Sequence, residues 1–470
     1  MNPIVNLITT VCSWLWGDLV TIPLPGGSSL GLPLLVLLLI PAGIYFTIRT
    51  RFLQIRLFPE MVRVTAEKHV GGQKGAISGL QALIVSTATR VGMGNMIGVV
   101  AAISAGGAGA VFWMWLSALI SSATAFIEAT LAQQYKEPDP LYGGYRGGPA
   151  YYIHAYVKEK RGGKMGKKSI IAVLFAVSGL ICWCGISQVI GNSVTSAFQN
   201  AFSIPPICTI VVLVILAAVI VLRKNATVKV LDVMVPIMAV CYFVMTLFLI
   251  AKNITLLPAV FQRIFAEAFG LRQAVAGGMG AVIMQGVKRG LFSNEAGSGS
   301  APCAAAAGDT SHPVKTGLLQ ALGVFIDTII ICSCTAFIML LTPESITGGL
   351  DGMDLLQASM GYHLGRFGVI FIAVTLWLFC FSTFIGILFY ARSNVAYLFG
   401  DNWASQTGYK VLCLVMLFIG GLAAYTFVWD LGDVGIGLMT VFNIIILIPM
   451  SRQALDALKE YEAEMKQRKK

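Results

Sequence analysis

One interrupted apolar segment constrains this chain more than any other feature. The apolar run from about Ile77 to Ser104 contains, near its middle, the sequence Ser86-Thr-Ala-Thr-Arg-Val-Gly-Met-Gly-Asn-Met-Ile-Gly98. Its glycines lower helix propensity, and its threonine, arginine and asparagine side chains are polar where hydrocarbon would be expected. Such a break is tolerated at membrane depth only where protein buries it or where it lines a cavity. The segment therefore predicts a membrane helix that is interrupted in the middle.

A broken membrane helix also predicts a binding site. The N–H groups freed at the start of a half-helix suit a carboxylate, and the freed carbonyl groups suit a small cation. We therefore interpret the segment around Gly92 as the floor of a solute site.

The composition is that of an all-α polytopic membrane protein. Of the 470 residues, 57% are hydrophobic and 12% are charged, and the mean hydropathy is +0.79. The net charge of +11 comes from basic residues in loops between apolar runs, as the positive-inside rule describes, so nucleic-acid binding is not expected. The ten cysteines lie in or beside apolar runs and indicate neither a metal site nor a disulfide.

The apolar runs predict about eleven membrane-spanning helices, preceded by an interfacial helix or lid over Ile4–Trp16. The first span is short for a membrane crossing. The predicted spans are Leu34–Ile48, Ile77–Ser104, Ala110–Ala132, Ile170–Gln188 or slightly beyond, Ile207–Leu222, Val230–Ile250, Ala266–Val287, Leu318–Leu341, Val369–Tyr390, Val411–Phe427 and Ile436–Pro449.

The basic residues predict the orientation of these spans. With eleven spans, every basic cluster falls on one side, including the pair Lys288-Arg289 and the tail Lys466–Lys470. The positive-inside rule makes this side cytoplasmic. We therefore expect a multi-pass protein of the cell membrane with its N-terminus outside and its C-terminus in the cytoplasm.

Two glycine clusters predict an internal repeat. Without the first span, ten spans form two sets of five, and the first span of each set contains a cluster, Gly92-Met-Gly94 or Gly277-Gly-Met-Gly280. An odd number of spans per set inverts the second set, and paired breaks in inverted repeats place a transporter's site at the midplane. Alternatively, the glycines only let helices pack closely. The predicted parts of this single domain are 1–74 (interfacial helix, extra span and basic loop), 75–258 (first repeat), 259–451 (second repeat) and 452–470 (basic tail).

Further polar residues inside the spans are candidate site residues. The Ser382 and Thr383 hydroxyls are hard ligands for a small cation, but they can instead bond to carbonyls of their own helix. Gln188 could donate to a carboxylate or join two helices by a hydrogen bond. Arg90 and Asp327 are costly in lipid and lie equally far from their span edges, which suggests an ion pair.

Three other carboxylates are expected near span ends. Glu128 and Asp232 are expected to have structural roles. The loop that contains Glu295 is interpreted as a cytoplasmic gate because Lys288 and Arg289 precede it, and the alternative is that this loop forms the site itself.

Two other classes of function fit the sequence less well. An intramembrane enzyme needs convergent acid, base or metal groups, whereas the four histidines lie in predicted loops or at span edges. A channel needs a continuous polar pore, which two isolated breaks do not supply.

Several segments together resemble the alanine or glycine:cation symporters, also called the sodium:alanine symporter family. The similarity extends over nearly the whole chain, and the run from Phe292 to Gly297 is especially specific. The matching segments are Arg90-Val-Gly-Met-Gly-Asn-Met-Ile-Gly-Val-Val100, Gly107-Ala-Gly-Ala-Val-Phe-Trp-Met-Trp115, Gly147-Gly-Pro-Ala-Tyr-Tyr152, Lys288-Arg-Gly-Leu-Phe-Ser-Asn-Glu-Ala-Gly-Ser-Gly-Ser-Ala-Pro302, Val324-Phe-Ile-Asp-Thr328, Phe381-Ser-Thr-Phe-Ile-Gly386 and Tyr397-Leu-Phe-Gly400.

The resemblance implies the inverted five-plus-five fold of sodium-coupled amino-acid transporters, with one extra N-terminal helix. It implies that sodium-coupled symport carries a small neutral amino acid, alanine or glycine, into the cell by alternating access. The expected partners are therefore the amino acid, sodium and the lipid bilayer. Neither catalysis nor a cofactor other than the coupling sodium is expected.

The resemblance also implies positions for the two ligands. The amino-acid carboxylate would bind backbone N–H groups of the break, and sodium would bind carbonyl and hydroxyl oxygens. The implied substrate residues are Gly92, Met93, Gly94, Asn95, Gln188, Gly277, Gly278, Met279, Gly280 and Ile387, and the implied sodium ligands are Ala88, Val91, Ser382 and Thr383.

Two residues depart from the family pattern and leave the substrate open. Family members commonly have Thr at the position of Met93 and Trp at that of Ile387, and both positions are expected to face the substrate. A sodium-coupled glutamine or serine carrier of the same family is therefore the alternative. Sodium is favoured over protons because Val233–Ile250 lacks the lysine that replaces sodium in some proton-coupled relatives.

Overall fold

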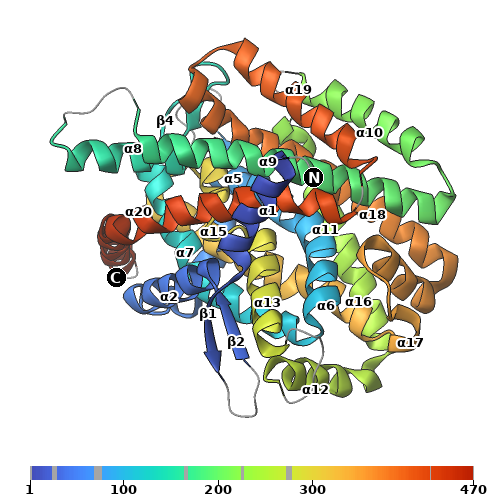
Figure 1. The fold of residues 1–470 in the computed structure, drawn as a ribbon. Helices are drawn as coiled ribbons and strands as arrows, with labels where there is room; N and C mark the ends of the chain where they lie inside the picture. Colours follow the sequence, from blue (N-terminus) through green and yellow to red (C-terminus); the bar gives the residue numbers. More distant parts are fainter. Residues whose placement is uncertain are drawn as a thin grey trace.

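The computed structural model describes residues 3–23, 29–67, 77–163, 168–223, 227–270, 278–423 and 425–468. In this part of the chain, helices pack into one bundle, and the strands form three two-stranded pairs, β1–β2, β3–β6 and β4–β5 (Figure 1). The elements are α1 (Pro3–Trp16), β1 (Asp18–Pro23), β2 (Ser29–Pro33), α2 (Leu34–Arg49), α3 (Leu53–Arg56), α4 (Phe58–Thr65), β3 (Ile77–Ser78), α5 (Gly79–Thr89), η1 (Arg90–Gly98), α6 (Val99–Gly106), α7 (Gly109–Gln134), β4 (Glu137–Pro138), β5 (Tyr145–Arg146), α8 (Pro149–Lys160), α9 (Ile170–Phe202), α10 (Pro206–Val221), α11 (Thr227–Lys252), η2 (Ile254–Leu256), α12 (Leu257–Ala268), α13 (Gly278–Asn294), α14 (Ala301–Ala307), β6 (Gly308–Asp309), α15 (Pro313–Val324), η3 (Phe325–Cys332), α16 (Ser333–Leu340), α17 (Glu344–Thr347), α18 (Gly352–Phe399), α19 (Trp403–Gly420) and α20 (Tyr425–Arg468).

Apolar helices long enough to cross a membrane form most of the bundle. Seven such helical stretches occur in the described residues, and Leu34–Arg49 and Pro206–Val221 are shorter apolar helices. Helices α13 and α19 also lie where spans were predicted. The seven stretches are Gly79–Gly106, Gly109–Gln134, Ile170–Phe202, Val233–Lys252, Pro313–Leu340, Gly352–Phe399 and Val428–Gln467.

The span predicted over Ala266–Val287 has the wrong bounds. Helix α12 ends at Ala268, and α13 begins at Gly278 and continues to Asn294. Gly278 and Gly280 therefore start a helix and do not interrupt one. Gly277 lies outside the described residues. The prediction failed because it followed hydrophobicity alone and ended the span where the first basic residues occur.

Lys288 and Arg289 lie inside the protein, so the prediction that they mark a cytoplasmic span edge is wrong. Both are buried in α13 and paired with Asp433 of α20, at 2.7 Å from Lys288 Nζ and 3.1 Å from Arg289 Nη1. The Lys288 ammonium also lies 5.1 Å from the centre of the Trp16 ring, and the Arg289 guanidinium lies 4.0 Å from that of Trp429. The carboxylate and the rings stabilise two cations that a loop would expose.

The segment predicted as a basic tail continues helix α20 as far as Arg468. It packs against the segment after α2, where the Tyr461 hydroxyl donates to Glu60 Oε1 at 2.6 Å. Arg63 forms two hydrogen bonds to the Glu60 carboxylate and holds the pKa of that carboxyl below its ordinary value. This end of α20 is therefore part of the packed fold.

Glycines allow α9 to lie against α19 and α20. A Cβ atom on Gly185 would overlap the backbone of Gly432 in α20, and one on Gly435 would overlap Cys182 in α9. One turn further along α9, a Cβ on Gly420 of α19 would overlap the Gln188 backbone. Small residues let membrane helices approach this closely, so these three glycines allow α9 to pack against α19 and α20.

We predict that Gly185→Ala destabilises the protein by about 1–3 kcal/mol, because the added methyl group must push α20 away from α9. The matched control is Gly408→Ala in α19, where an added Cβ meets no atom within 4 Å. The control should be neutral or stabilising by up to about 1 kcal/mol because alanine favours the helix. Thermal unfolding in detergent measures both, and equal melting temperatures for the two variants would contradict the prediction.

Candidate functional site

The predicted break in the first long apolar run is confirmed. Between α5 and α6, Val91 (φ −75°, ψ 69°) and Gly92 (φ −146°, ψ −143°) leave the helical conformation. All residues of η1, from Arg90 to Gly98, are buried. The freed backbone groups are therefore enclosed by protein, as a break at membrane depth requires.

Side chains satisfy the first N–H groups of the half-helix that follows the break. The Asn95 side-chain oxygen accepts from the Gly92 N–H at 2.8 Å, as the third residue of a capping box does. The Met93 N–H donates to the Thr383 hydroxyl of α18 at 3.2 Å. The positive end of this half-helix thus lies against α18.

Three of the predicted sodium ligands converge at the break. The Ser382 and Thr383 hydroxyls lie 3.2 and 3.5 Å from the Ala88 carbonyl oxygen, and both also bond to the Phe379 carbonyl of their own helix. With ψ at 69°, the Val91 carbonyl points away from the helical direction of α5. Hard oxygen atoms from two segments far apart in sequence therefore meet here, which suits a small hard cation.

Close packing at the break depends on glycines. A Cβ on Gly92 would overlap the Thr383 hydroxyl, and one on Gly386 would overlap the Thr89 side chain. A Cβ on Gly94 would lie 2.9 Å from Cα of Ser293 in α13. Helices α13 and α18 can therefore lie directly on η1.

Asp327 is held by neutral hydrogen-bond donors, so the predicted Arg90–Asp327 ion pair is wrong. Its Oδ1 accepts from the Asn95 amide at 2.6 Å, and its Oδ2 accepts from the Ser293 and Thr328 hydroxyls at 2.9 and 2.8 Å. The two residues do lie in neighbouring segments, η1 and η3. Counting residues from span edges estimated their depth but could not show which way the side chains point.

Arg90 donates instead to a backbone carbonyl. Its Nη1 lies 3.1 Å from the Gln320 oxygen, and the side chain is buried. Nε and Nη2 of this guanidinium have no hydrogen-bond partner among the described residues.

A second buried break follows α13, and it differs from the predicted one. Between α13 and α14 the chain takes positive φ at Glu295 (57°), Gly297 (98°) and Gly299 (82°). The prediction had placed this break at Gly277–Gly280. Sequence reasoning missed it because the segment lay beyond the assumed span end, although its two glycines and its serines gave a signal.

Buried polar side chains hold this second break. Glu128 of α7 accepts from the Gly297 N–H at 3.1 Å, and the Asn443 amide of α20 donates to both the Gly297 carbonyl and the Glu128 carboxylate. Glu128 therefore has the structural role expected of it. Glu295 lies 3.4 Å from the Thr89 hydroxyl just before η1, so the two breaks adjoin.

The structure places some of the implied substrate residues away from the break. The Gln188 amide lies 3.5 Å from the Met416 sulfur on α19, which matches the helix–helix alternative. A Cβ on Gly280 would lie 2.8 Å from the backbone of Gly31 in β2. From Gly280 to Ser293, which lies against η1, α13 rises about 20 Å, so the Gly278–Gly280 segment does not reach the break.

Of the remaining implied residues, Met93 and Ile387 are buried at or near the break, whereas Met279 is not. Met93 belongs to η1, and Ile387 follows Gly386 in α18. Met279 is partly buried and packs near Gly270 at the start of α13.

We predict that Asn95→Asp destabilises the protein by at least about 2 kcal/mol, because it places a second carboxylate against buried Asp327. Adding Asp327→Asn should recover part of this loss, since the new amide can donate to the new carboxylate. The matched control is Asn402→Asp at the N-cap of α19, where aspartate caps as well as asparagine. Thermal unfolding is measured for the unmodified protein, for Asn95→Asp and Asp327→Asn alone, for the double variant and for the control. Strictly additive effects of the two changes would contradict this network.

Known proteins similar to this chain are transporters. Residues 26–470 match the sodium:alanine symporter family. The probable sodium/glutamine symporter GlnT of Bacillus subtilis is 42% identical, covering 92% of this chain and 88% of its own length. The amino-acid carrier protein AlsT of the same organism is 41% identical, covering 92% and 90%. The sodium/alanine symporter AgcS of Methanococcus maripaludis is 34% identical, covering 97% of each chain.

A solved structure shares the fold. The manganese transporter of Eremococcus coleocola, crystallised with an aromatic bis-isothiourea compound, aligns with a TM-score of 0.51 at 12% sequence identity, covering 85% of this chain and 80% of that chain. The family match over nearly all of the sequence agrees with the apolar helices of the structure. This chain therefore belongs to the sodium:alanine symporter family, and it is a multi-pass membrane transporter and not an enzyme.

Proposed function

We propose that this transporter uses the sodium gradient to carry a small neutral amino acid into the cell by alternating access. The observation that carries the proposal is the convergence of the Ala88 carbonyl with the Ser382 and Thr383 hydroxyls beside the broken helix. Family membership supports sodium as the coupling ion. No other cofactor is part of this proposal.

Sodium and the amino-acid carboxylate would bind on either side of Thr383. Its hydroxyl lies against the Ala88 carbonyl and also accepts from the Met93 N–H, so one side chain contacts both proposed positions. A cation there offsets the cost of placing a carboxylate in a low-dielectric chamber. Each ligand should therefore raise the affinity for the other by the same factor.

The ammonium group of the amino acid would bind at the second break. Positive φ angles at Glu295 and Gly297 turn backbone groups out of the helical pattern, and the Glu295 carboxylate lies beside Thr89. This position for the ammonium group follows the alternative in which the loop containing Glu295 belongs to the site. The second break then takes the role that the sequence analysis gave to Gly277–Gly280.

We propose alanine or glycine as the substrate, with glutamine or serine as the alternative. The departures from the family pattern at Met93 and Ile387 favour a chamber of different shape, and relatives named for alanine and for glutamine are both similar to this chain. Competition by unlabelled amino acids for uptake of labelled alanine separates these substrates.

We also propose the inverted repeat with its second break corrected. Eleven spans would comprise α2 as the extra helix and two sets of five that begin with the two broken helices, within the domain parts stated above. The adjoining breaks at η1 and at 295–300 support this pairing. The basic residues where α2 and α20 end support a cell-membrane protein with a cytoplasmic C-terminus and an outer N-terminus.

We predict that an inward sodium gradient drives uptake of labelled amino acid into proteoliposomes, and that Ser382→Ala and Thr383→Val weaken the sodium dependence. Loss of one ligand should raise the sodium concentration for half-maximal uptake by roughly tenfold, about 1.4 kcal/mol. The matched control is Ser359→Ala, whose hydroxyl bonds within its own turn of α18. Uptake that does not depend on sodium would contradict the assignment of Ser382 and Thr383 as sodium ligands. An equal change in the sodium concentration for half-maximal uptake in all three variants would contradict it as well.

A further inference from the structure

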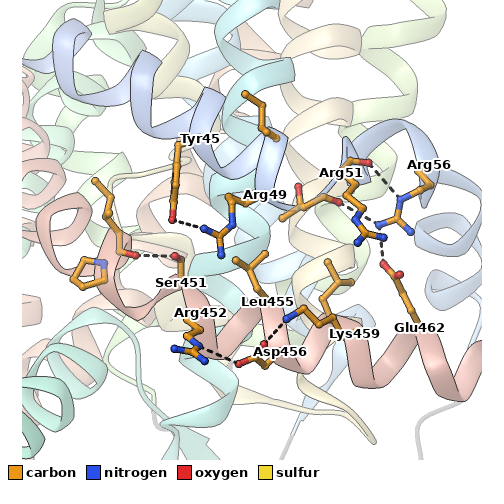
Figure 2. A pocket seen from close by; sticks show the side chains of 15 residues that line it. Tyr45, Arg49, Arg51, Arg56, Ser451, Arg452, Leu455, Asp456, Lys459 and Glu462 are labelled. Carbon is orange, nitrogen blue, oxygen red and sulfur yellow. Dashed lines mark hydrogen bonds and ion pairs between the residues drawn. The ribbon is translucent and has the colours of Figure 1, made fainter.

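A large polar cavity lies where α2 ends beside the C-terminal half of α20, outside the proposed transport site. Its volume is about 880 Å³, and it lies between the end of α2, the segment from Thr50 to Arg56 and the C-terminal half of α20 (Figure 2). Five basic side chains line it, Arg49, Arg51, Arg56, Arg452 and Lys459.

The cavity carries an excess of positive charge. Only two acidic residues line it, and these are already paired. Glu462 pairs with Arg56 at 2.7 Å, and Asp456 pairs with Lys459 at 2.7 Å and with Arg452 at 3.8 Å. Arg49 donates to the Tyr45 hydroxyl at 3.3 Å. Neither Arg49 nor Arg51 forms an ion pair within 4 Å with a carboxylate of the described residues. Two guanidinium groups are thus available to an anion.

Apolar surface leads directly into this basic cavity. Ile44 and Ile48 are exposed on α2, one turn apart, immediately before Arg49. On α20, Ile445 and Ile448 are exposed on the face that continues to Arg452. Both helices therefore change from apolar to basic at the same end, which marks the boundary between hydrocarbon and headgroups.

We propose that this cavity binds the headgroup of an anionic phospholipid, with the acyl chains against the exposed isoleucines. The phosphate oxygens would accept hydrogen bonds from Arg49 and Arg51, because a planar guanidinium matches phosphate geometry. Lipids with a net negative headgroup, such as phosphatidylglycerol, would be preferred, since the ammonium of a zwitterionic headgroup would meet the uncompensated arginines. Free inorganic phosphate lacks the chains that the apolar surface would hold. A bound lipid would bridge α2 and α20.

The test measures lipid binding to the full-length purified protein. Delipidated protein in detergent is titrated with phosphatidylglycerol, with phosphatidylcholine and with inorganic phosphate, and bound lipid is counted by native mass spectrometry alongside the melting temperature. We expect phosphatidylglycerol to bind and to raise the melting temperature. The variant Arg49→Gln/Arg51→Gln should bind it roughly 30-fold more weakly, from about one kcal/mol for each basic residue near the surface.

A matched control removes the same charge elsewhere. Arg161 and Arg223 are exposed and have no described side-chain partner, so Arg161→Gln/Arg223→Gln should bind phosphatidylglycerol as the unmodified protein does. The proposal would be overturned if phosphatidylcholine bound as tightly as phosphatidylglycerol, or if inorganic phosphate raised the melting temperature as much. It would also be overturned if the control variant bound phosphatidylglycerol as weakly as the Arg49→Gln/Arg51→Gln variant. If the double variant fails to fold, Arg452→Gln replaces it, because that side chain is 87% exposed and its ion pair with Asp456 is long, at 3.8 Å. Loss of this one charge should weaken phosphatidylglycerol binding roughly fivefold, and unchanged binding would overturn the proposal.

Discussion

The structure depends on enclosing the polar backbone of a broken helix. An unsatisfied backbone group in a membrane costs several kcal/mol, so the interruption at Val91 and Gly92 can exist only where other segments supply partners. Asn95 supplies one from within η1, and Thr383 supplies another from α18. The glycines on both sides of this contact let the two helices meet. The packing around the break thus follows from the need to provide hydrogen-bond partners for its backbone groups.

Buried carboxyl and amide groups extend this constraint to the second break. Asp327 links η1 to α13 through Asn95 and Ser293, and Glu128 links α7 to the turn at Gly297. Because these groups are buried, the elements that satisfy them cannot separate without loss of hydrogen bonds. The two breaks are therefore held next to each other by the same polar groups that make them tolerable. A transporter that binds two ligands at such a junction has a physical route for coupling them.

The sequence predicted an all-helical membrane protein and the first break because both leave local signals. Apolar run length located most of the helices, and the glycine and polar residues before Gly98 located the interruption. Side-chain direction left no such signal, so Arg90 was paired with Asp327, although its guanidinium donates to the Gln320 carbonyl. The Lys288-Arg289 pair was read as a loop because its partner, Asp433, is distant in sequence. That one error also moved the second break, since it ended the span too early.

The most direct test of this account is a linked binding experiment on the purified protein. The dissociation constants of alanine and of glutamine are measured across a range of sodium concentrations, and that of sodium is measured with and without saturating amino acid. We expect sodium to tighten binding of the transported amino acid by roughly 5- to 150-fold, and the amino acid to tighten sodium binding by the same factor. Affinities for both amino acids that stay constant as sodium varies would contradict a shared site at the broken helix.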